Sequence, residues 1–302
     1  MVHLILTGAT GLVGSAVLSH ILSLPASSTP TITRLSILSR NTKIPLLSLT
    51  PPPGTPSVNK HTRIEVIEHK DFASYPPELL DKLKGADACI WTLGVSQNDV
   101  SKDQFARITR DFALEAAKAF SSLRDHSAKS DGDKKTTSTA PSPSDSGSSS
   151  DAKKFKFIYV SSEGATTAPK PWTPLYCRVK GETERALLAL SKQNSFKDCL
   201  AVYSVRPGAV DGHNEPWLWK GILAEKRSAF QKFYLPTLMV PIRAVGGTLH
   251  TPTEELGRVL VEMAVRESRE AYALGPGVEK EGEGRTLGNT AVKRLGREEE
   301  GR

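Results

Sequence analysis

Cysteine and long apolar runs are scarce in this sequence, and both scarcities exclude classes of protein. The 302 residues include three cysteines, Cys89, Cys177 and Cys199, whose spacing matches no disulfide framework or metal site. The histidines form no HExxH-type cluster, so we expect no metal. No stretch approaches the roughly 20 apolar residues that span a bilayer, and the first residues lack the basic lead-in of a signal peptide. We therefore expect a reducing compartment, either the cytoplasm or a membrane face reached through an internal signal.

Dense positive charge is absent as well. The formal net charge of +7 is spread along the chain, without the Lys/Arg block typical of nucleic-acid binding, so we expect no nucleic-acid partner. A chain of 302 residues is long enough to bury one sizeable core with a smaller appended lobe.

The most informative stretch lies at the beginning of the chain. Residues 2–7 form an apolar run that predicts a strand, and a helix-like stretch over 15–24 follows. The turn between them is typical of a dinucleotide-binding fingerprint, in which a pyrophosphate lies against backbone N–H groups at the helix N-terminus. A Cβ at Gly8 or Gly11 would keep the phosphates away, and one at Gly14 would push the helix off its strand. The predicted cofactor contacts here are Thr7, Gly8, Thr10, Gly11, Leu12, Val13 and Gly14.

The end of the second predicted strand, over 34–39, bears on the choice of cofactor. NAD-specific sites place a carboxylate there for the ribose 2′-hydroxyl, whereas an arginine accommodates the 2′-phosphate of NADP. This sequence has Arg40 at that position, with Lys43 close behind and no carboxylate. We therefore expect NADP(H) in preference to NAD(H). The alternative is that Arg40 is an ordinary surface residue.

Three later strand ends supply further candidate contacts. Asp71 follows the predicted strand 64–68 and would either approach the adenine edge or cap the next turn. The apolar strand 88–92 ends at Leu93 and Gly94, where a small residue lets the backbone lie along a cofactor. After the strand 200–205, Pro207 and Gly208 would lie beside the nicotinamide or form a plain turn.

The candidate catalytic residues are Ser162, Tyr176 and Lys180. A strand over 155–160 ends at two serines, of which we choose Ser162, and a helix then begins near Tyr176. Tyr176 and Lys180 are four residues apart, so they share one helix face. A phenol with a pKa near ~10 is a poor proton donor at neutral pH, and a neighbouring ammonium lowers that pKa. A serine hydroxyl would orient the substrate oxygen for proton transfer.

The domain organisation follows from composition. We expect one α/β domain over 1–275, a doubly wound parallel sheet with helices on both faces, including a helix over 102–123. The polar segment 124–154 is predicted to be a disordered insertion. A small lobe over 209–252 carries many aromatic residues and suits a substrate lid, a lobe core or a membrane-facing surface. A last helix over 253–266 and a loose charged tail over 276–302 complete the prediction.

Together, the glycine turn, the serine pair and Tyr176 with Lys180 resemble the short-chain dehydrogenase/reductase family of the extended or atypical kind. Stretches 108–112, 176–184 and 203–208 are similar to the branch of the Tat-interacting tumour-suppressor protein and its fungal mitochondrial outer-membrane relatives. The resemblance implies a Rossmann domain, NADP(H), a Ser-Tyr-Lys set and a homodimer formed through the two long helices. It also implies attachment at the mitochondrial outer membrane. One departure is the sequence 109–111, where extended enzymes usually carry an Asn that supports a water relay to the lysine.

These features favour an NADP(H)-dependent oxidoreductase acting on a small-molecule carbonyl or alcohol. Two other interpretations stay open. One is an NADP(H)-binding regulatory or scaffold protein whose cofactor holds a conformation that a partner or a membrane surface reads. The other is a nucleotide-sugar epimerase or reductase, for which the lobe after Gly208 is short.

Replacing Arg40 by alanine tests the cofactor prediction. A guanidinium binds phosphate through paired hydrogen bonds, so Arg40→Ala is expected to weaken NADPH binding and leave NADH binding nearly unchanged. Calorimetric titration of the wild type and the variant with each nucleotide measures both. Equal losses for the two nucleotides would contradict a role for Arg40 at the 2′-phosphate.

Overall fold

The computed structural model describes residues 1–25, 31–49, 59–124, 154–215, 249–266 and 272–300. Most of the predicted insertion and most of the aromatic part of the predicted lobe therefore lie outside the described residues. None of the helices in the described ranges has the length and apolarity that a bilayer crossing requires.

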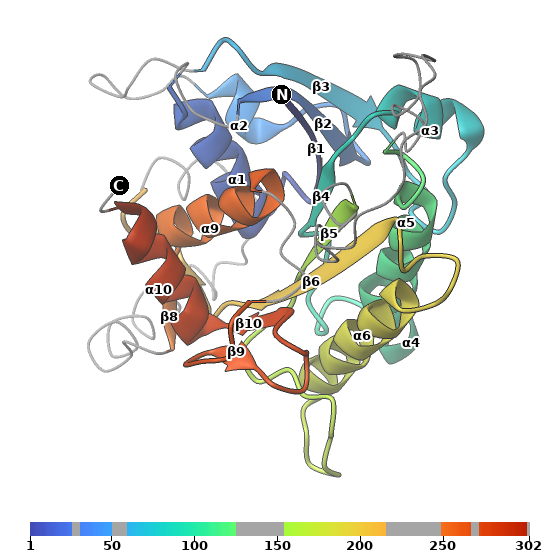
Figure 1. The fold of residues 1–302 in the computed structure, drawn as a ribbon, viewed down its shortest axis with the longest axis vertical. Helices are drawn as coiled ribbons and strands as arrows, with labels where there is room; N and C mark the ends of the chain where they lie inside the picture. The colour runs from blue at the N-terminus through green and yellow to red at the C-terminus, as the bar shows by residue number, and fades with distance from the viewer. Residues whose placement is uncertain (26–30, 50–58, 125–153, 216–248, 267–271, 301–302) are drawn as a thin grey trace, which may run out of the picture.

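A mostly parallel sheet forms the centre of the fold (Figure 1). Its order is β3-β2-β1-β4-β5-β6-β10-β9, and each neighbouring pair is parallel except β10 with β9. The strands span Val2–Thr7 (β1), Ile32–Ser39 (β2), Arg63–Glu68 (β3), Ala88–Trp91 (β4), Phe155–Val160 (β5), Leu200–Arg206 (β6), Val278–Glu279 (β9) and Thr286–Gly288 (β10). Strand order reverses between β1 and β4, which is the topological switch point where ligands bind in such sheets. The predicted doubly wound α/β fold is confirmed.

Helices cover both faces of the sheet, and the strands therefore bury side chains on both sides. One face is covered by α1 (Leu12–Ser23), α9 (Thr253–Val265) and α10 (Asn289–Glu300). The other is covered by α3 (Pro77–Leu83), α4 (Lys102–Ala106), α5 (Phe112–Phe120) and α6 (Leu175–Ser191). A short helix, α2, spans Pro45–Ser48.

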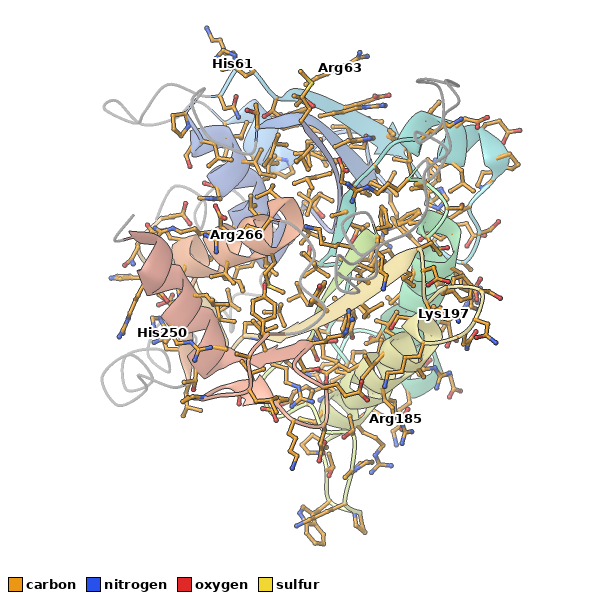
Figure 2. The ribbon with its side chains drawn as sticks, viewed as in Figure 1. His61, Arg63, Arg185, Lys197, His250 and Arg266 are labelled. Atoms are coloured by element: carbon orange, nitrogen blue, oxygen red, sulfur yellow. The ribbon has the colours of Figure 1, made fainter. Side chains whose placement is uncertain are left out.

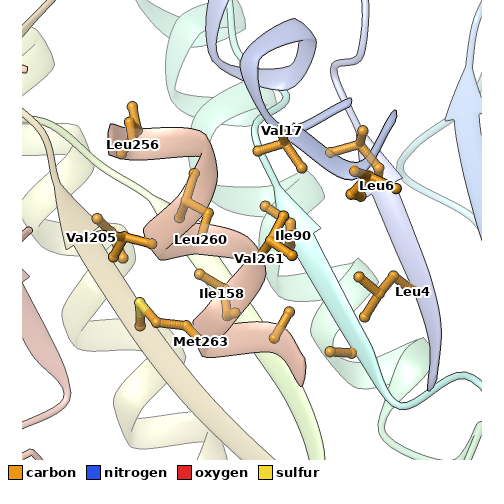
Figure 3. Packing of buried hydrophobic residues seen from close by; sticks show 14 of the residues in the cluster. Leu4, Leu6, Val17, Ile90, Ile158, Val205, Leu256, Leu260, Val261 and Met263 are labelled. Atoms are coloured by element: carbon orange, nitrogen blue, oxygen red, sulfur yellow. The ribbon is translucent and has the colours of Figure 1, made fainter. Parts of the chain in front are cut away.

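The core on the α9 side shows how the strands alternate. Leu4 and Leu6 of β1 face α9 and α1, whereas Ile5 between them belongs to the cluster on the opposite face. Figure 3 shows Leu256, Leu260 and Met263 of α9 packed against the strands. These apolar contacts fix the sheet, and with it the strand ends that carry the candidate site.

The region predicted as a loose tail is part of the fold, so that prediction is wrong. Thr286–Gly288 (β10) pairs in parallel with β6, and α10 follows it against the same face as α9. Charged residues dominate α10, but Ala291 and Val292 are fully buried. The three residues of β10 and the narrow apolar stripe of α10 are enough to join this segment to the sheet. They were not predicted from the sequence because so few apolar residues give no periodic pattern.

Two other elements differ from the sequence prediction. The predicted helix over 102–123 is interrupted by a π-helical segment, Arg107–Asp111, between α4 and α5. The described ends of the predicted lobe form a two-stranded parallel sheet, Ala209–Asp211 (β7) with His250–Pro252 (β8).

A buried lysine links the sheet to α9. Lys156 of β5 is 3% exposed, and its amine donates hydrogen bonds to the Met263 and Arg266 carbonyls at the end of α9. Burial lowers the pKa of Lys156 to about 8. The amine thus supplies hydrogen bonds to carbonyls at a helix end, where intrahelical donors run out.

Shortening Leu287 tests whether the C-terminal segment belongs to the core. Leu287 is fully buried on β10, between Val205 of β6 and Val278 of β9. Leu287→Ala is expected to lower the free energy of unfolding by about 2–5 kcal/mol, measured by urea denaturation. The control Arg297→Ala, on an exposed position of α10, should change it by less than about 0.5 kcal/mol. Similar stability of both variants would place 276–302 outside the cooperative fold.

Candidate active site

The glycine turn leaves the end of β1 and starts α1. The Gly11 amide donates a hydrogen bond to the Gly8 carbonyl over 2.9 Å, and α1 begins at Leu12 without a side-chain cap. A Cβ at Gly14 would lie 2.2 Å from the Gly8 oxygen, whereas one at Gly11 would meet only that oxygen, at 3.3 Å. No side chain caps the N–H groups at the start of α1, and few atoms crowd Gly11. This arrangement is suited to binding a pyrophosphate.

Gly8 is required by a packing constraint that the sequence analysis did not include. Its φ of +72° is in the left-handed region, and a Cβ there would lie 2.6 Å from the Thr92 hydroxyl oxygen and 2.7 Å from the Thr92 carbonyl. The Thr92 hydroxyl in turn donates a hydrogen bond of 2.6 Å to the Thr7 carbonyl. Gly8 therefore packs the turn against the end of β4, and clearance for phosphates at Gly8 and Gly11 stays a prediction.

The other predicted cofactor contacts lie at the carboxyl ends of strands, along the edge that the glycine turn occupies. Arg40 is exposed directly after β2, while Leu93 is half-buried and Gly94 exposed beyond β4. Asp71 is exposed, and its Oδ1 accepts a hydrogen bond of 3.1 Å from the Ala73 amide, as the capping alternative predicts. Its approach to the adenine edge stays a prediction. Parallel strands bring these residues to one edge.

The serine pair lies immediately beyond β5. The hydroxyl oxygens of Ser161 and Ser162 are both buried, and neither has a hydrogen-bond partner within the described part of the chain. A buried hydroxyl without a protein partner is costly, and an ordered water or a ligand can complete it. The choice of Ser162 over Ser161 stays a prediction.

Tyr176 and Lys180 lie in the first turns of α6, which starts after Pro174. Tyr176 is 37% exposed, and its amide donates a hydrogen bond of 3.1 Å to Oε1 of Gln97 in the loop after β4. The Lys180 side chain runs inward, and its amine donates a hydrogen bond of 2.9 Å to the Ser161 carbonyl. The structure thus joins the predicted lysine to the predicted serine pair.

The protonation of these groups differs from the prediction. Burial lowers the pKa of Lys180 to about 8, with Glu184 and Cys177 opposing the shift. The pKa of Tyr176 is raised, first by a hydrogen bond with the Cys177 side chain and then by partial burial. Lys180 was expected to lower the pKa of this phenol, but its amine is engaged by the Ser161 carbonyl instead.

Two close backbone contacts position this region, and both escaped the sequence analysis. A Cβ at Gly181 would lie 1.9 Å from the Thr166 carbonyl oxygen, so α6 rests directly on the loop after β5. A Cβ at Gly208 would lie 2.4 Å from the Leu249 carbonyl oxygen. Pro207 and Gly208 were predicted to lie beside the nicotinamide or to form a plain turn. The neighbour that demands a glycine at 208 is the chain's own backbone, and the nicotinamide contact stays a prediction.

Gly208 belongs to a buried polar network that includes the start of α10. The Gly208 amide donates to the Thr251 hydroxyl over 2.8 Å, and that hydroxyl donates to Oδ1 of Asn289 over 2.5 Å. The backbone N–H of Asn289 donates a hydrogen bond of 3.2 Å to Oε2 of Glu163, the residue after Ser162. No sequence signal could identify Asn289 while its segment was taken for a loose tail.

A cavity of about 620 Å³ adjoins the loop after β5. Its lining residues are Ala165, Thr166, Arg206, Glu279, Lys280 and Glu281. Charges of both signs thus line it, and Tyr176 and Lys180 are not among the lining residues. Within the described ranges, no group of three His, Cys, Asp or Glu side chains is placed to hold a metal ion.

The π-helical segment contains residues 109–111, where the sequence lacks the asparagine that the family resemblance leads us to expect. Thr109 is buried within it, and Arg110 contacts Oδ1 of Asp111 over 2.8 Å and Oε2 of Glu182 on α6 over 3.9 Å. Single π-helical turns within α-helices occur frequently at functional sites.

Comparison with known proteins places these features in context. No family model matches the chain. The leucinostatins biosynthesis cluster protein T of Purpureocillium lilacinum is 27% identical over 96% of this chain and 94% of its own length. The botcinic acid biosynthesis cluster B protein 16 of Botryotinia fuckeliana is 34% identical over 151 residues, which are 46% of this chain and 84% of that protein.

Solved structures show the same fold at low identity. MoeE5 in complex with UDP-glucose and NAD is 16% identical with a TM-score of 0.52, over 99% of this chain and 82% of that chain. The Pseudomonas aeruginosa RhlG/NADP complex is 13% identical with a TM-score of 0.52, over 87% of this chain and 88% of that chain. Both support the Rossmann-like fold. None of the proteins named here points to the Tat-interacting or mitochondrial branch.

Replacing Lys180 by methionine tests the burial of its amine. The pKa is about 8 in the fold and about 10.5 in the unfolded chain, which therefore holds the proton more tightly. Stability consequently rises with pH between these values, by up to about 3 kcal/mol from this amine. In Lys180→Met, the part of this rise in stability that comes from Lys180 should disappear. The pKa of Lys156 is also lowered to about 8, so the contribution of Lys156 to the rise should remain.

Urea denaturation below pH 8 and above pH 10.5 measures this rise. The matched control is Lys197→Met, because Lys197 is exposed beyond the end of α6 (Figure 2). This variant should retain the full wild-type rise. A Lys180→Met protein that also retained it would show that the amine is solvated.

Proposed function

The chain belongs to the family of the botcinic acid biosynthesis cluster B protein 16, and from this premise we propose that it is a tailoring oxidoreductase. It would use NADP(H) to interconvert a carbonyl and an alcohol on a small molecule, with short-chain dehydrogenase chemistry. The second relative, matched over 96% of this chain, also belongs by name to a biosynthesis cluster, which supports the proposal.

One observation carries the chemistry. The Lys180 amine, one turn beyond Tyr176 on α6, donates a hydrogen bond to the carbonyl of Ser161. The hydroxyls of Ser161 and Ser162 are buried, and neither has a partner among the described residues. A phenol, an amine and an unpaired hydroxyl at one sheet edge are the groups that proton exchange at a carbonyl oxygen needs.

The roles of the three residues follow from their chemistry. The Ser162 hydroxyl would donate a hydrogen bond to the substrate oxygen and orient it, and Tyr176 would exchange the proton at that oxygen. Lys180 would stabilise the phenolate as the proton leaves. The glycine turn and the first turn of α1, which has no side-chain cap, would hold the diphosphate, and Arg40 would contact a 2′-phosphate. NADP(H), when bound, supplies or accepts the hydride.

A second candidate is a cofactor-binding regulatory protein with little turnover. The raised pKa of Tyr176 favours it, because a phenol that keeps its proton at neutral pH is a poor catalyst. This candidate predicts tight NADPH binding without consumption of NADPH by any carbonyl compound. It also predicts that capture of a protein partner changes when NADPH is added.

Replacing Tyr176 by phenylalanine separates the two candidates. NADPH consumption, followed by absorbance over a panel of aldehydes and ketones, is expected to fall by about 10²–10⁴-fold in Tyr176→Phe, because the proton donor is lost. NADPH binding, measured by calorimetry, should persist.

The matched control is Tyr75→Phe, which removes a buried hydroxyl without a partner in the described residues, next to Phe120 of α5. Its turnover should equal that of the wild type. Undiminished turnover in Tyr176→Phe would rule out the proposed proton donor, and binding without turnover in the wild type would favour the regulatory protein.

A further inference from the structure

A buried ion pair lies directly behind Lys180, and the proposed chemistry does not use it. Glu184 is one turn beyond Lys180 on α6, and its side chain is 3% exposed. Arg206 is the last residue of β6. Its Nε donates to both Glu184 carboxylate oxygens, over 3.0 and 3.1 Å, and its Nη2 donates to Oε2 over 2.6 Å. This forked geometry holds the carboxylate in one orientation.

Other charged groups surround the pair from several elements. Nη1 of Arg206 lies 3.8 Å from Oε1 of Glu279 on β9, and Glu163 of the loop after β5 also acts on the guanidinium. Glu184 in turn acts on Lys180 and on the buried Tyr159 of β5. On α6 itself, Cys177 is the other titratable group that acts on Lys180.

Stability alone gives a weak reason for this arrangement. Removing two charges from water costs about as much as their attraction returns, and apolar replacements of buried pairs are often neutral or stabilising. A pair that lies one helical turn from a candidate catalytic amine has a more direct use. The Glu184 carboxylate attracts the Lys180 amine electrostatically. The Arg206 guanidinium neutralises part of that negative charge and so determines how strong the attraction is.

We propose that Glu184 and Arg206 are positioning residues that hold the Lys180 amine on the Ser161 carbonyl, behind Tyr176. This inference rests on the proposed function of Lys180. Without Arg206, Glu184 would be an unpaired buried carboxylate four residues from Lys180, and it would draw the amine into an ion pair along α6. Without the charge of Glu184, the buried amine would lose the neighbour that favours its protonated form.

The pair also connects the site to the end of β6. Arg206 immediately precedes Pro207 and Gly208, and the Pro207 carbonyl accepts a hydrogen bond of 2.8 Å from the Glu163 amide. Fixing Arg206 on α6 therefore aligns the end of β6 with the loop that carries Ser162. The same two side chains thus set both the charge near the amine and the relative position of α6 and β6.

The test uses opposite changes in the titration of Lys180. In Glu184→Gln the midpoint is expected to fall by about one pH unit or more, because a favourable negative charge is lost. In Arg206→Gln it should rise, because Lys180 becomes the nearest cation to Glu184. The double variant should return toward the wild type, and Glu184→Asp should rescue the single loss. A purely structural pair would give shifts of the same sign, or none.

Nitrogen NMR of lysine-labelled full-length protein measures the midpoint, with Lys180→Arg assigning the signal. If Arg206→Gln does not fold by circular dichroism, Arg206→Lys replaces it, keeping a cation but losing the fork, and should shift the midpoint upward. Shifts of the same sign in the two single variants, or unchanged midpoints in folded proteins, would overturn the proposal.

A kinetic arm distinguishes this proposal from the proposed function. If turnover is found, the pH profile of kcat should move in the same two directions while the Kd for NADPH stays constant. If no carbonyl compound is reduced, the oxidoreductase assignment fails, yet the NMR titration still decides whether Glu184 and Arg206 control the amine.

Discussion

Backbone contacts too close for any side chain hold the parts of the candidate site together. The carbonyls of Gly8, Thr166 and Leu249 occupy the space that a Cβ at Gly14, Gly181 or Gly208 would need. The first contact seats α1 on β1, the second seats α6 on the loop after β5, and the third seats β8 against the end of β6. Three elements from distant parts of the chain therefore reach one sheet edge with little freedom to shift.

This packing has an electrostatic consequence at α6. Because the helix rests on the loop after β5, the Lys180 amine is brought onto the Ser161 carbonyl and away from bulk water. The phenol one turn earlier is left partly exposed with a raised pKa. Activation of Tyr176 by its lysine is thus no automatic result of their spacing; it requires the amine to be shared between the carbonyl and the phenol.

The elements predicted from the sequence are those whose signal lies within one continuous stretch of residues. Apolar runs and the glycine turn predicted β1, β4 and β5 and the start of α1, because each signal lies within one continuous stretch. Gly208 was predicted to lie beside a ligand or to form a plain turn, because its neighbours in the structure, Leu249 and Asn289, lie some 40 and 80 residues away in sequence. The segment 276–302 was missed because β10 has three residues and α10 is mostly charged, and the π-helical segment has no periodicity of its own.

The two-residue strand β9 has a consequence for self-association. β6 is seven residues long and buried, and without the C-terminal segment its outer side would present a row of unpaired peptide groups. β10 covers only part of that side, and antiparallel β9 then ends the sheet with a strand too short to template another chain. Proteolysis between α9 and β9, followed by loss of the C-terminal segment, would therefore expose the unpaired edge of β6, to which another chain can add a strand.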